Sequence, residues 1–84
     1  MNLFVANLHP KTRGKDLQAL FSQYGTVLSA RVIIDKQTGK SKRYGFVEFE
    51  NDAEAEAAIN ALNDSDFQGN KIAVKISIPK TEEN

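Results

Sequence analysis

The order in which strand-like and helix-like segments follow one another restricts the fold of this chain more than any other feature of its sequence. Short runs rich in β-branched and aromatic residues predict strands, and apolar residues that recur every three to four positions predict helices. These criteria predict strands at residues 3–8, 27–34, 42–49 and 72–76, and helices at residues 13–24 and 52–62. The predicted order is therefore strand, helix, strand, strand, helix, strand.

The ends of both predicted helices carry residues that are typical of helix termini. Thr12 is placed to cap the start of the first helix, and Gly25 follows its end, where glycine is the usual C′ residue. Asn51, with Glu54 three residues later, resembles a capping box at the start of the second helix. These signals support the predicted helix boundaries.

Each predicted helix has one apolar stripe, so both are expected to pack on one face of a sheet and to leave the other face open. The β-α-β-β-α-β order is that of a ferredoxin-like α+β sandwich, with a four-stranded antiparallel sheet. A chain of 84 residues has room for one core. We expect a single domain over residues 1–79 and a polar tail over residues 80–84. The predicted core residues are Leu17, Leu20, Phe21, Val32, Val47, Phe49, Ile59, Leu62 and Val74.

The composition excludes several classes of function. The absence of cysteine excludes a disulfide framework, a thiolate nucleophile and a cysteine-bound metal, and a single histidine leaves too few ligands for zinc. No apolar run approaches the roughly 18 residues of a membrane-spanning helix. No positively charged segment precedes the first apolar run, as it does in a signal peptide. We therefore expect a cytoplasmic protein that uses no metal and no cofactor and does not bind a membrane.

The charged residues are sorted along the chain, although the net charge is zero. Residues 31–43 carry five bases and one acid, whereas residues 48–66 carry seven acids and no base. The acidic run falls largely on or beside the second predicted helix, behind the sheet. Most of the bases fall on strands and loops that border the open face. This sorting predicts one basic face on a neutral molecule.

Side-chain alternation predicts three aromatic rings on the open face. Val47 and Phe49 supply bulk to the core, so the alternate positions of strand 42–49 face outward. Leu3 and Val5 face inward on the first strand by the same argument. The residues predicted on the open face of these two strands are Phe4, Ala6, Lys42, Tyr44, Phe46 and Glu48. A cluster of exposed aromatic rings on a small protein indicates a binding surface.

Two motifs on these strands resemble a known family. LFVANL at residues 3–8 resembles the hexamer of the RNA recognition motif, and KRYGFVEF at residues 42–49 resembles its octamer, K/R-G-F/Y-G/A-F-V-x-F/Y. Seven of the eight octamer positions fit, and the exception is Arg43, where the family usually has glycine. The resemblance covers essentially the whole chain. The chain is similar to the small stand-alone RNA-binding proteins of bacteria, which favours a stand-alone protein, with a domain excised from a longer protein as the alternative.

The resemblance implies binding of single-stranded RNA on the open face, and a role in post-transcriptional regulation. Phe4 and Phe46 would stack on two neighbouring bases, and Tyr44 would pack against the sugars between them. Stacking of a base on an aromatic side chain is worth about 1–3 kcal/mol. Single-stranded RNA offers unstacked bases for such contacts, whereas duplex bases are already stacked on each other.

Basic residues around the rings are expected to contact the RNA backbone. Lys42 occupies the octamer position that would neutralise a phosphate, and Arg31 and Lys75 lie on the other strands of the open face. The candidate RNA-binding residues are therefore Phe4, Arg31, Lys42, Arg43, Tyr44, Phe46 and Lys75.

Arg43 and Glu48 do not fit the pattern simply. Strict alternation turns Arg43 toward the helices, where an unpaired guanidinium is costly. We expect its stem to lie along the protein with the charge in solvent, beside Lys40 at the rim of the RNA track, or else an ion pair with Asp35. Glu48 either lies beyond the RNA track or pairs with a nearby lysine.

Residues in the loops carry weaker expectations. His9 is predicted to be a solvated loop residue, and Asn7 to satisfy local backbone groups at the end of the first strand. For the loop cations, contact with RNA and simple solvation remain open alternatives. These cations are Lys11, Arg13, Lys36 and Lys40.

Two other classes of function are alternatives. A protein–protein adaptor uses this fold in some family members, but those usually lose or cover the aromatic rings that this chain keeps. An acylphosphatase-like hydrolase would need a glycine-rich anion-binding loop after the first strand. Residues 9–14 contain an arginine but no such cradle, and no nucleophile with a partner base is visible. We therefore expect a monomer that is not an enzyme, with the adaptor as the alternative.

Overall fold

The computed structural model describes residues 1–77 of the 84-residue chain. Its main sheet has four antiparallel strands in the order β2-β3-β1-β6. The elements are β1 (Asn2–Ala6), α1 (Gly14–Phe21), β2 (Val27–Ile34), β3 (Ser41–Phe49), α2 (Asp52–Leu62), β4 (Asp66–Phe67), β5 (Asn70–Lys71) and β6 (Ala73–Ser77). The predicted ferredoxin-like fold is confirmed, and the predicted tail at 80–84 lies outside the described residues.

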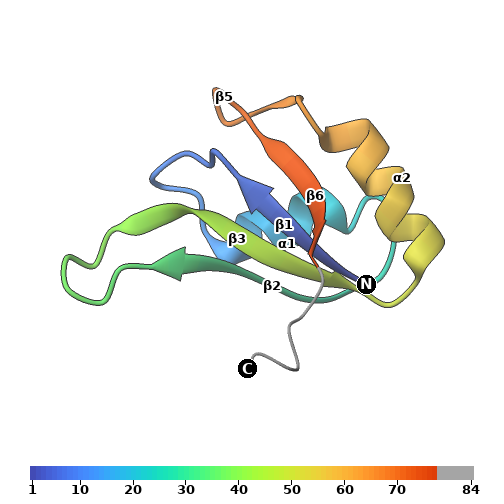
Figure 1. The fold of residues 1–84 in the computed structure, drawn as a ribbon, viewed down its shortest axis with the longest axis horizontal. Helices are drawn as coiled ribbons and strands as arrows, with labels where there is room; N and C mark the ends of the chain where they lie inside the picture. The colour runs from blue at the N-terminus through green and yellow to red at the C-terminus, as the bar shows by residue number, and fades with distance from the viewer. Residues whose placement is uncertain (78–84) are drawn as a thin grey trace.

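Both helices pack on the same face of the sheet. α1 contacts mainly β2 and also β3, whereas α2 contacts β6, β1 and β3. In Figure 1 the sheet lies in front of α1, and α2 runs along the outer side of β6. Within residues 1–77 no helix or strand covers the front of this sheet. The open face that the sequence predicts is therefore present.

The core lies between the sheet and the helices, where alternate strand residues meet the helix stripes. Leu3 and Val5 on β1 are fully buried opposite Val47 and Gly45 on β3. The ring of Phe49 packs edge-to-face against that of Phe21 on α1, with the centroids 6.0 Å apart. All the predicted core residues belong to this layer, with Leu20, Val32 and Ile59 only partly buried.

The start of α1 corrects the predicted cap. Arg13, not Thr12, is the N-cap residue, and its backbone N–H donates to the Asp16 carboxylate at 2.8 Å. Thr12 is fully buried instead, and its hydroxyl donates to the side-chain oxygen of Gln68. The contact joins two segments far apart in the sequence, so the residue ties the β1–α1 loop to the β4–β5 turn.

The end of α1 also differs from prediction, because the helix stops at Phe21 and not at residue 24. Gly25 is therefore not a C′ glycine. A Cβ at this position would collide with the Glu54 side chain of α2. A carboxylate oxygen of Glu54 accepts the backbone N–H of Thr26 at 3.2 Å. The glycine thus serves close packing between the start of α2 and the turn before β2.

The start of α2 agrees with prediction in its bounds and in its cap. The side-chain oxygen of Asn51 accepts the backbone N–H of Glu54 at 3.1 Å. Only this half of the capping box forms, because the Glu54 carboxylate bonds to Thr26 instead. Ala55 and Ala58 are fully buried, and these small side chains let α2 approach the sheet closely.

A short hairpin, β4–β5, lies between α2 and β6, where the sequence predicts no strand. Its turn residues Gln68 and Gly69 both have positive φ, 54° and 87°. Two consecutive positive φ values are typical of the two-residue turns that join hairpin strands. Glutamine is not among the residues that predict such a turn from sequence. β6 then begins at Ala73, one residue later than predicted, while Ile72 is fully buried beside it.

Candidate nucleic-acid interface

Strand register arranges the open face in rows that run across the sheet. Phe4 on β1 lies directly opposite Phe46 on β3, with the ring centroids 5.6 Å apart. Arg31 on β2 continues this row beyond Phe46, and Lys75 on β6 continues it beyond Phe4. We name Arg31–Phe46–Phe4–Lys75 the aromatic row. It places two flat rings on the central strands and one cation on each outer strand.

Tyr44 completes the ring cluster from the next row along β3. It lies opposite Ala6, and its ring centroid is 5.5 Å from that of Phe4 and 6.2 Å from that of Phe46. The three rings are half-buried and not fully exposed as expected, because they pack against one another. Mutual packing restricts their rotamers, so the rings are held in place in the unbound protein.

The cations of the open face take different positions relative to the rings. The guanidinium carbon of Arg31 lies 5.9 Å from the centre of the Phe46 ring, within the range of a cation–π contact. Lys75 and Lys42 are exposed, the latter at the irregular end of β3. The predicted cations therefore surround the rings on β2, β3 and β6.

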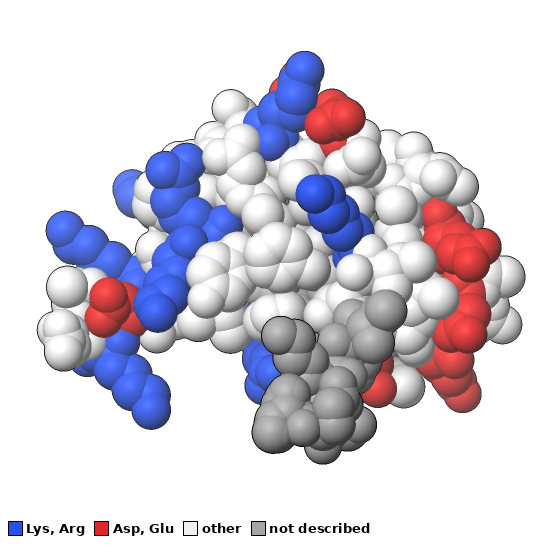
Figure 2. Space-filling view, in the orientation of Figure 1, with Lys and Arg blue, Asp and Glu red and all other residues white. Residues whose placement is uncertain are grey.

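Charge on the folded molecule is sorted as the sequence predicts. In Figure 2, lysine and arginine gather over the end of the sheet that carries the β2–β3 loop, and a single basic side chain lies on the other side of the uncharged centre of the open face. Aspartate and glutamate line the opposite edge, along α2. Since the net charge is zero, this separation gives the open face a basic character without a basic protein.

Arg43 lies in a break in the β2–β3 ladder. The register shifts between Val32 and Ile34, and Arg43 has a positive φ of 66°. Strict alternation therefore does not apply, and the side chain is exposed, as expected. The left-handed backbone also explains the glycine that the family prefers here, since glycine adopts positive φ without a steric penalty.

The side chain of Arg43 finds a partner that neither alternative predicted. Its Nε donates to the carbonyl of Leu8 at 2.9 Å, and its own carbonyl accepts the Leu8 N–H at 2.9 Å. No ion pair with Asp35 forms among residues 1–77. These two hydrogen bonds join Arg43 on β3 to Leu8, which follows β1, and so continue the β1–β3 pairing past the end of β1. The arginine side chain as a whole is exposed.

Two residues that follow β1 have structural roles. Asn7 has a φ of 62°, and its amide nitrogen donates to the carbonyl of Lys71 at 2.7 Å. The expectation of a local backbone partner is wrong, because this partner is 64 residues away in the sequence. His9 is half-buried, and its Nδ1 accepts the Lys11 N–H at 3.0 Å, so it orders the loop and is not merely solvated.

A polar row lies beside the aromatic row, two residues further along each strand. Glu48 lies opposite Asn2 and Ser29, and Asn2 lies opposite Ser77. No side-chain hydrogen bond or ion pair engages these four side chains within the described part of the chain. Of the two alternatives for Glu48, the ion pair with a lysine does not form there. This row was not predicted from the sequence, because only the strand register brings its members together.

An open sheet that presents aromatic rings between cations has a surface suited to nucleic acid. The chain matches the family model described as the RNA recognition motif over residues 3–73. It belongs to this family, and it is an RNA-binding domain.

Proteins with similar sequences support this assignment. The polyadenylate-binding protein, cytoplasmic and nuclear, of Candida glabrata is 44% identical over 81 residues, which are 96% of this chain. The chain spans only 14% of the length of that relative. The putative RNA-binding protein RbpA of Synechocystis is 38% identical over 80 residues, which are 95% of this chain and 79% of that protein.

Solved structures show the same architecture. The crystal structure of RNA-binding protein PG1 superposes with a TM-score of 0.92 at 48% identity, over 98% of this chain and 99% of that one. A structure of the Sex-lethal protein in complex with RNA superposes with a TM-score of 0.88 at 31% identity. That match covers 96% of this chain and 48% of the other.

Proposed function

We propose that this domain binds short single-stranded RNA on the open face of its sheet. Phe4 and Phe46 stack on two neighbouring bases, and Tyr44 packs against the sugars between them. The observation that carries the proposal is the aromatic row, in which two rings 5.6 Å apart lie between two cations. Flat rings at this spacing suit two bases of one strand whose own stacking is open.

The cations supply the second part of the binding energy. Arg31, Lys42 and Lys75 flank the rings on three strands and would neutralise phosphates, with Arg43 adding positive potential at the rim. Phosphate contacts hold the strand in register but do not read its sequence. Two rings and a few cations suit a site of two to four nucleotides with roughly micromolar affinity.

The remaining parts of the proposal concern the setting in which the domain acts. We infer a monomer that binds RNA without catalysis, metal or cofactor, and that takes part in post-transcriptional regulation in the cytoplasm. None of the helices described in residues 1–77 is long and apolar enough to cross a membrane. No cluster of three or more metal-binding side chains lies in this part of the chain. The names of the relatives, a polyadenylate-binding protein among them, agree with an RNA-binding role.

Titration with matched single-stranded and duplex RNA tests the proposal. We expect Phe4→Ala, Tyr44→Ala and Phe46→Ala each to weaken binding of the single strand. Tyr24→Ala is the matched control, because it removes a half-buried ring that packs against the core and not on the open face. Unchanged affinity in all three variants, or equal affinity for the duplex, would exclude stacking on this face and leave the protein–protein adaptor as the better hypothesis.

A further inference from the structure

The polar row lies at the end of the open face that is away from the β2–β3 hairpin. Glu48 on β3 stands between Asn2 on β1 and Ser29 on β2, and Asn2 lies opposite Ser77 on β6. Glu48 and Ser29 are exposed, and the other two residues are half-buried. The row therefore presents one carboxylate to solvent, with a side chain that can donate a hydrogen bond on each side of it.

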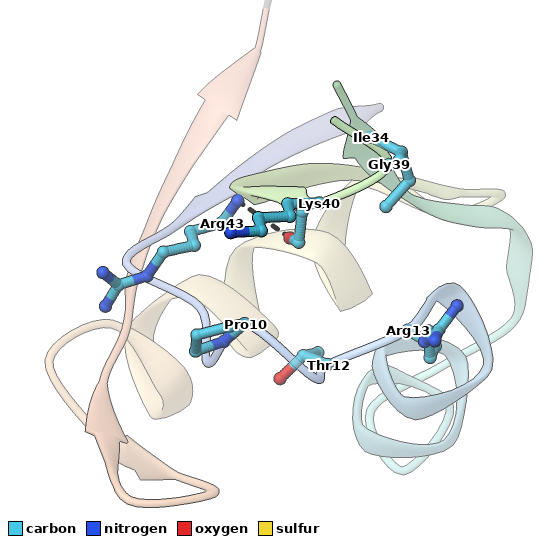
Figure 3. Close-up of a pocket in the computed structure, with 8 residues that line it drawn as sticks. Pro10, Thr12, Arg13, Ile34, Gly39, Lys40 and Arg43 are labelled. Atoms are coloured by element: carbon cyan, nitrogen blue, oxygen red, sulfur yellow. Dashed lines mark hydrogen bonds between the residues drawn. The ribbon is translucent and has the colours of Figure 1, made fainter. Parts of the chain in front are cut away.

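The two ends of the open face differ in charge. At the hairpin end, a pocket between the β2–β3 hairpin and the β1–α1 loop is lined by the cations Arg13, Lys40 and Arg43 (Figure 3). At the other end, Glu48 is the only acid among the paired positions of the open face in residues 1–77. Because a carboxylate repels phosphates, RNA that crosses the polar row is expected to place a base over it and not its backbone.

Glu48 is placed to reach the base that stacks on Phe46. Both side chains project from the same face of β3, two residues or about 6.7 Å apart along the strand. A base stacked on the ring lies one van der Waals contact above it, with its edge directed along the sheet. The long glutamate side chain can raise its carboxylate to that level, and no hydrogen bond or ion pair within residues 1–77 holds it elsewhere.

A carboxylate distinguishes the four bases because it only accepts hydrogen bonds. In a single strand the Watson–Crick edge of each base is open to the protein. On guanine this edge has two adjacent donors, N1–H and the N2 amine, which match the two carboxylate oxygens. Adenine and cytosine have one donor beside a ring nitrogen that accepts, and uracil has one donor between two carbonyls. Those acceptors repel a carboxylate, which therefore favours guanine.

The neighbours of Glu48 complete the match to guanine. The O6 carbonyl of guanine lies next to N1–H, so it needs a donor beside the carboxylate. Asn2 and Ser29 offer such donors on opposite sides of Glu48. Guanine thus finds its third hydrogen bond in either of the two directions in which its edge can lie across the row.

We propose that the polar row makes this domain selective for guanine at the nucleotide stacked on Phe46, with Glu48 as the specificity-determining residue. The carboxylate accepts from N1–H and the N2 amine, and Asn2 or Ser29 donates to O6. The inference rests on the proposed function, because the row meets a base edge only when the rings hold the base. It adds a base preference to the open face and leaves the stacking unchanged.

Uridine tetranucleotides that carry one guanine, placed at each position in turn, test this preference. Guanine at one position is expected to raise the affinity on the order of tenfold over uridine, and adenine or cytosine there to raise it less. Inosine, which lacks the N2 amine, should lose most of the gain. 7-Deazaguanine, which keeps the Watson–Crick edge, should retain it. A gain that survives in inosine but is lost in 7-deazaguanine would place recognition on another edge and overturn the proposal.

Glu48→Gln is the decisive variant, because it keeps the size of the side chain and replaces one acceptor with a donor. It should bind the guanine and inosine tetranucleotides equally, while its affinity for the uridine tetranucleotide stays the same or rises. Glu56→Gln makes the same change at an exposed position on α2 and should keep the full preference. If Glu48→Gln raises the affinity for every tetranucleotide by one factor and keeps the guanine gain, the residue acts by charge alone and the proposal is wrong.

The uridine tetranucleotide separates this inference from the proposed function. If Phe46→Ala weakens its binding but guanine adds nothing at any position in the parent protein, the open-face mechanism stands and the guanine site is rejected. If the parent protein binds none of the tetranucleotides, both are rejected. A guanine gain that disappears in Phe46→Ala and in Glu48→Gln, but not in Glu56→Gln, supports both.

Discussion

The two faces of β3 carry the same residue type in opposite settings. Phe49 is 1% exposed and lies edge-to-face with Phe21, their centroids 6.0 Å apart. Phe46, three residues earlier, pairs with Phe4 at a similar 5.6 Å but faces the open side. The centroid distances of the two pairs are similar, and the main difference is whether a helix covers the rings. A ring covered by a helix stabilises the fold, whereas an uncovered ring is available to a ligand.

Truncation of the covered ring tests the first half of this comparison and has the largest expected effect. Phe49→Ala is expected to lower the free energy of unfolding by about 3–5 kcal/mol, because it leaves a cavity in a closed core. Urea denaturation followed by circular dichroism measures it. Phe49→Leu, which keeps most of the volume, should cost much less, and an equal loss in both variants would show that this core is not tightly packed.

Truncation of the uncovered ring tests the second half. Phe46→Ala is expected to weaken RNA binding by about 1–3 kcal/mol. The free energy of unfolding should fall by only about 1 kcal/mol, since the ring loses its contacts with Phe4 and Tyr44 but creates no cavity. Parallel titrations and melts of this one variant give both values. A stability loss as large as that of Phe49→Ala would remove the distinction between the two faces.

The salt dependence of RNA binding distinguishes phosphate contacts, which weaken as salt rises, from stacking, which does not depend on charge. If about three phosphates are neutralised, a plot of the logarithm of the binding constant against the logarithm of the salt concentration should have a slope of about −2. Arg31→Gln should reduce this slope by about 0.7, the share of one contact. Phe46→Ala should lower the affinity at every salt concentration and leave the slope unchanged. Titration of the three proteins over a salt series supplies the slopes.

Replacement of Arg43 by the glycine of the family pattern has the smallest expected effect. The change relieves a left-handed backbone, worth about 1–2 kcal/mol, and removes one hydrogen bond to Leu8, worth about 1 kcal/mol. The free energy of unfolding should therefore stay within about 1 kcal/mol of the parent. RNA affinity should fall severalfold at low salt and approach the parent value as salt rises. An unchanged affinity at low salt would leave Arg43 with a structural role alone.

The sequence predicted those parts of the molecule that depend on local patterns. The bounds of α2 and the outward positions of Phe4, Tyr44 and Phe46 follow from hydrophobic periods and strand alternation, and the structure places them as expected. The roles of these rings in binding RNA stay predictions. The core was predictable for the same reason, because one apolar stripe per element leaves few ways to bury it.

The parts that escaped prediction depend on contacts between distant segments. Nothing near Thr12 indicates its bond to Gln68, and nothing near Asn7 indicates Lys71. The break in the β2–β3 ladder at Arg43 was not predicted, because its positive φ belongs to an arginine. A glycine at this position would have indicated a positive φ. The pocket beneath the β2–β3 hairpin escaped for the same reason as these contacts, since its two walls come from segments that meet only in the folded chain.

The separation of charge on this neutral molecule has a consequence for how it approaches RNA. With no net charge, the protein meets a polyanion as an electric dipole and not as a cation, so its attraction weakens steeply with distance and depends on orientation. Such a molecule is attracted only weakly to a phosphate chain in general. Its dipole orients the open face toward the strand only at close range. In the proposed function, stacking on the rings then sets how long the domain stays bound to single-stranded RNA, and duplex nucleic acid, whose bases are already stacked, holds it more weakly.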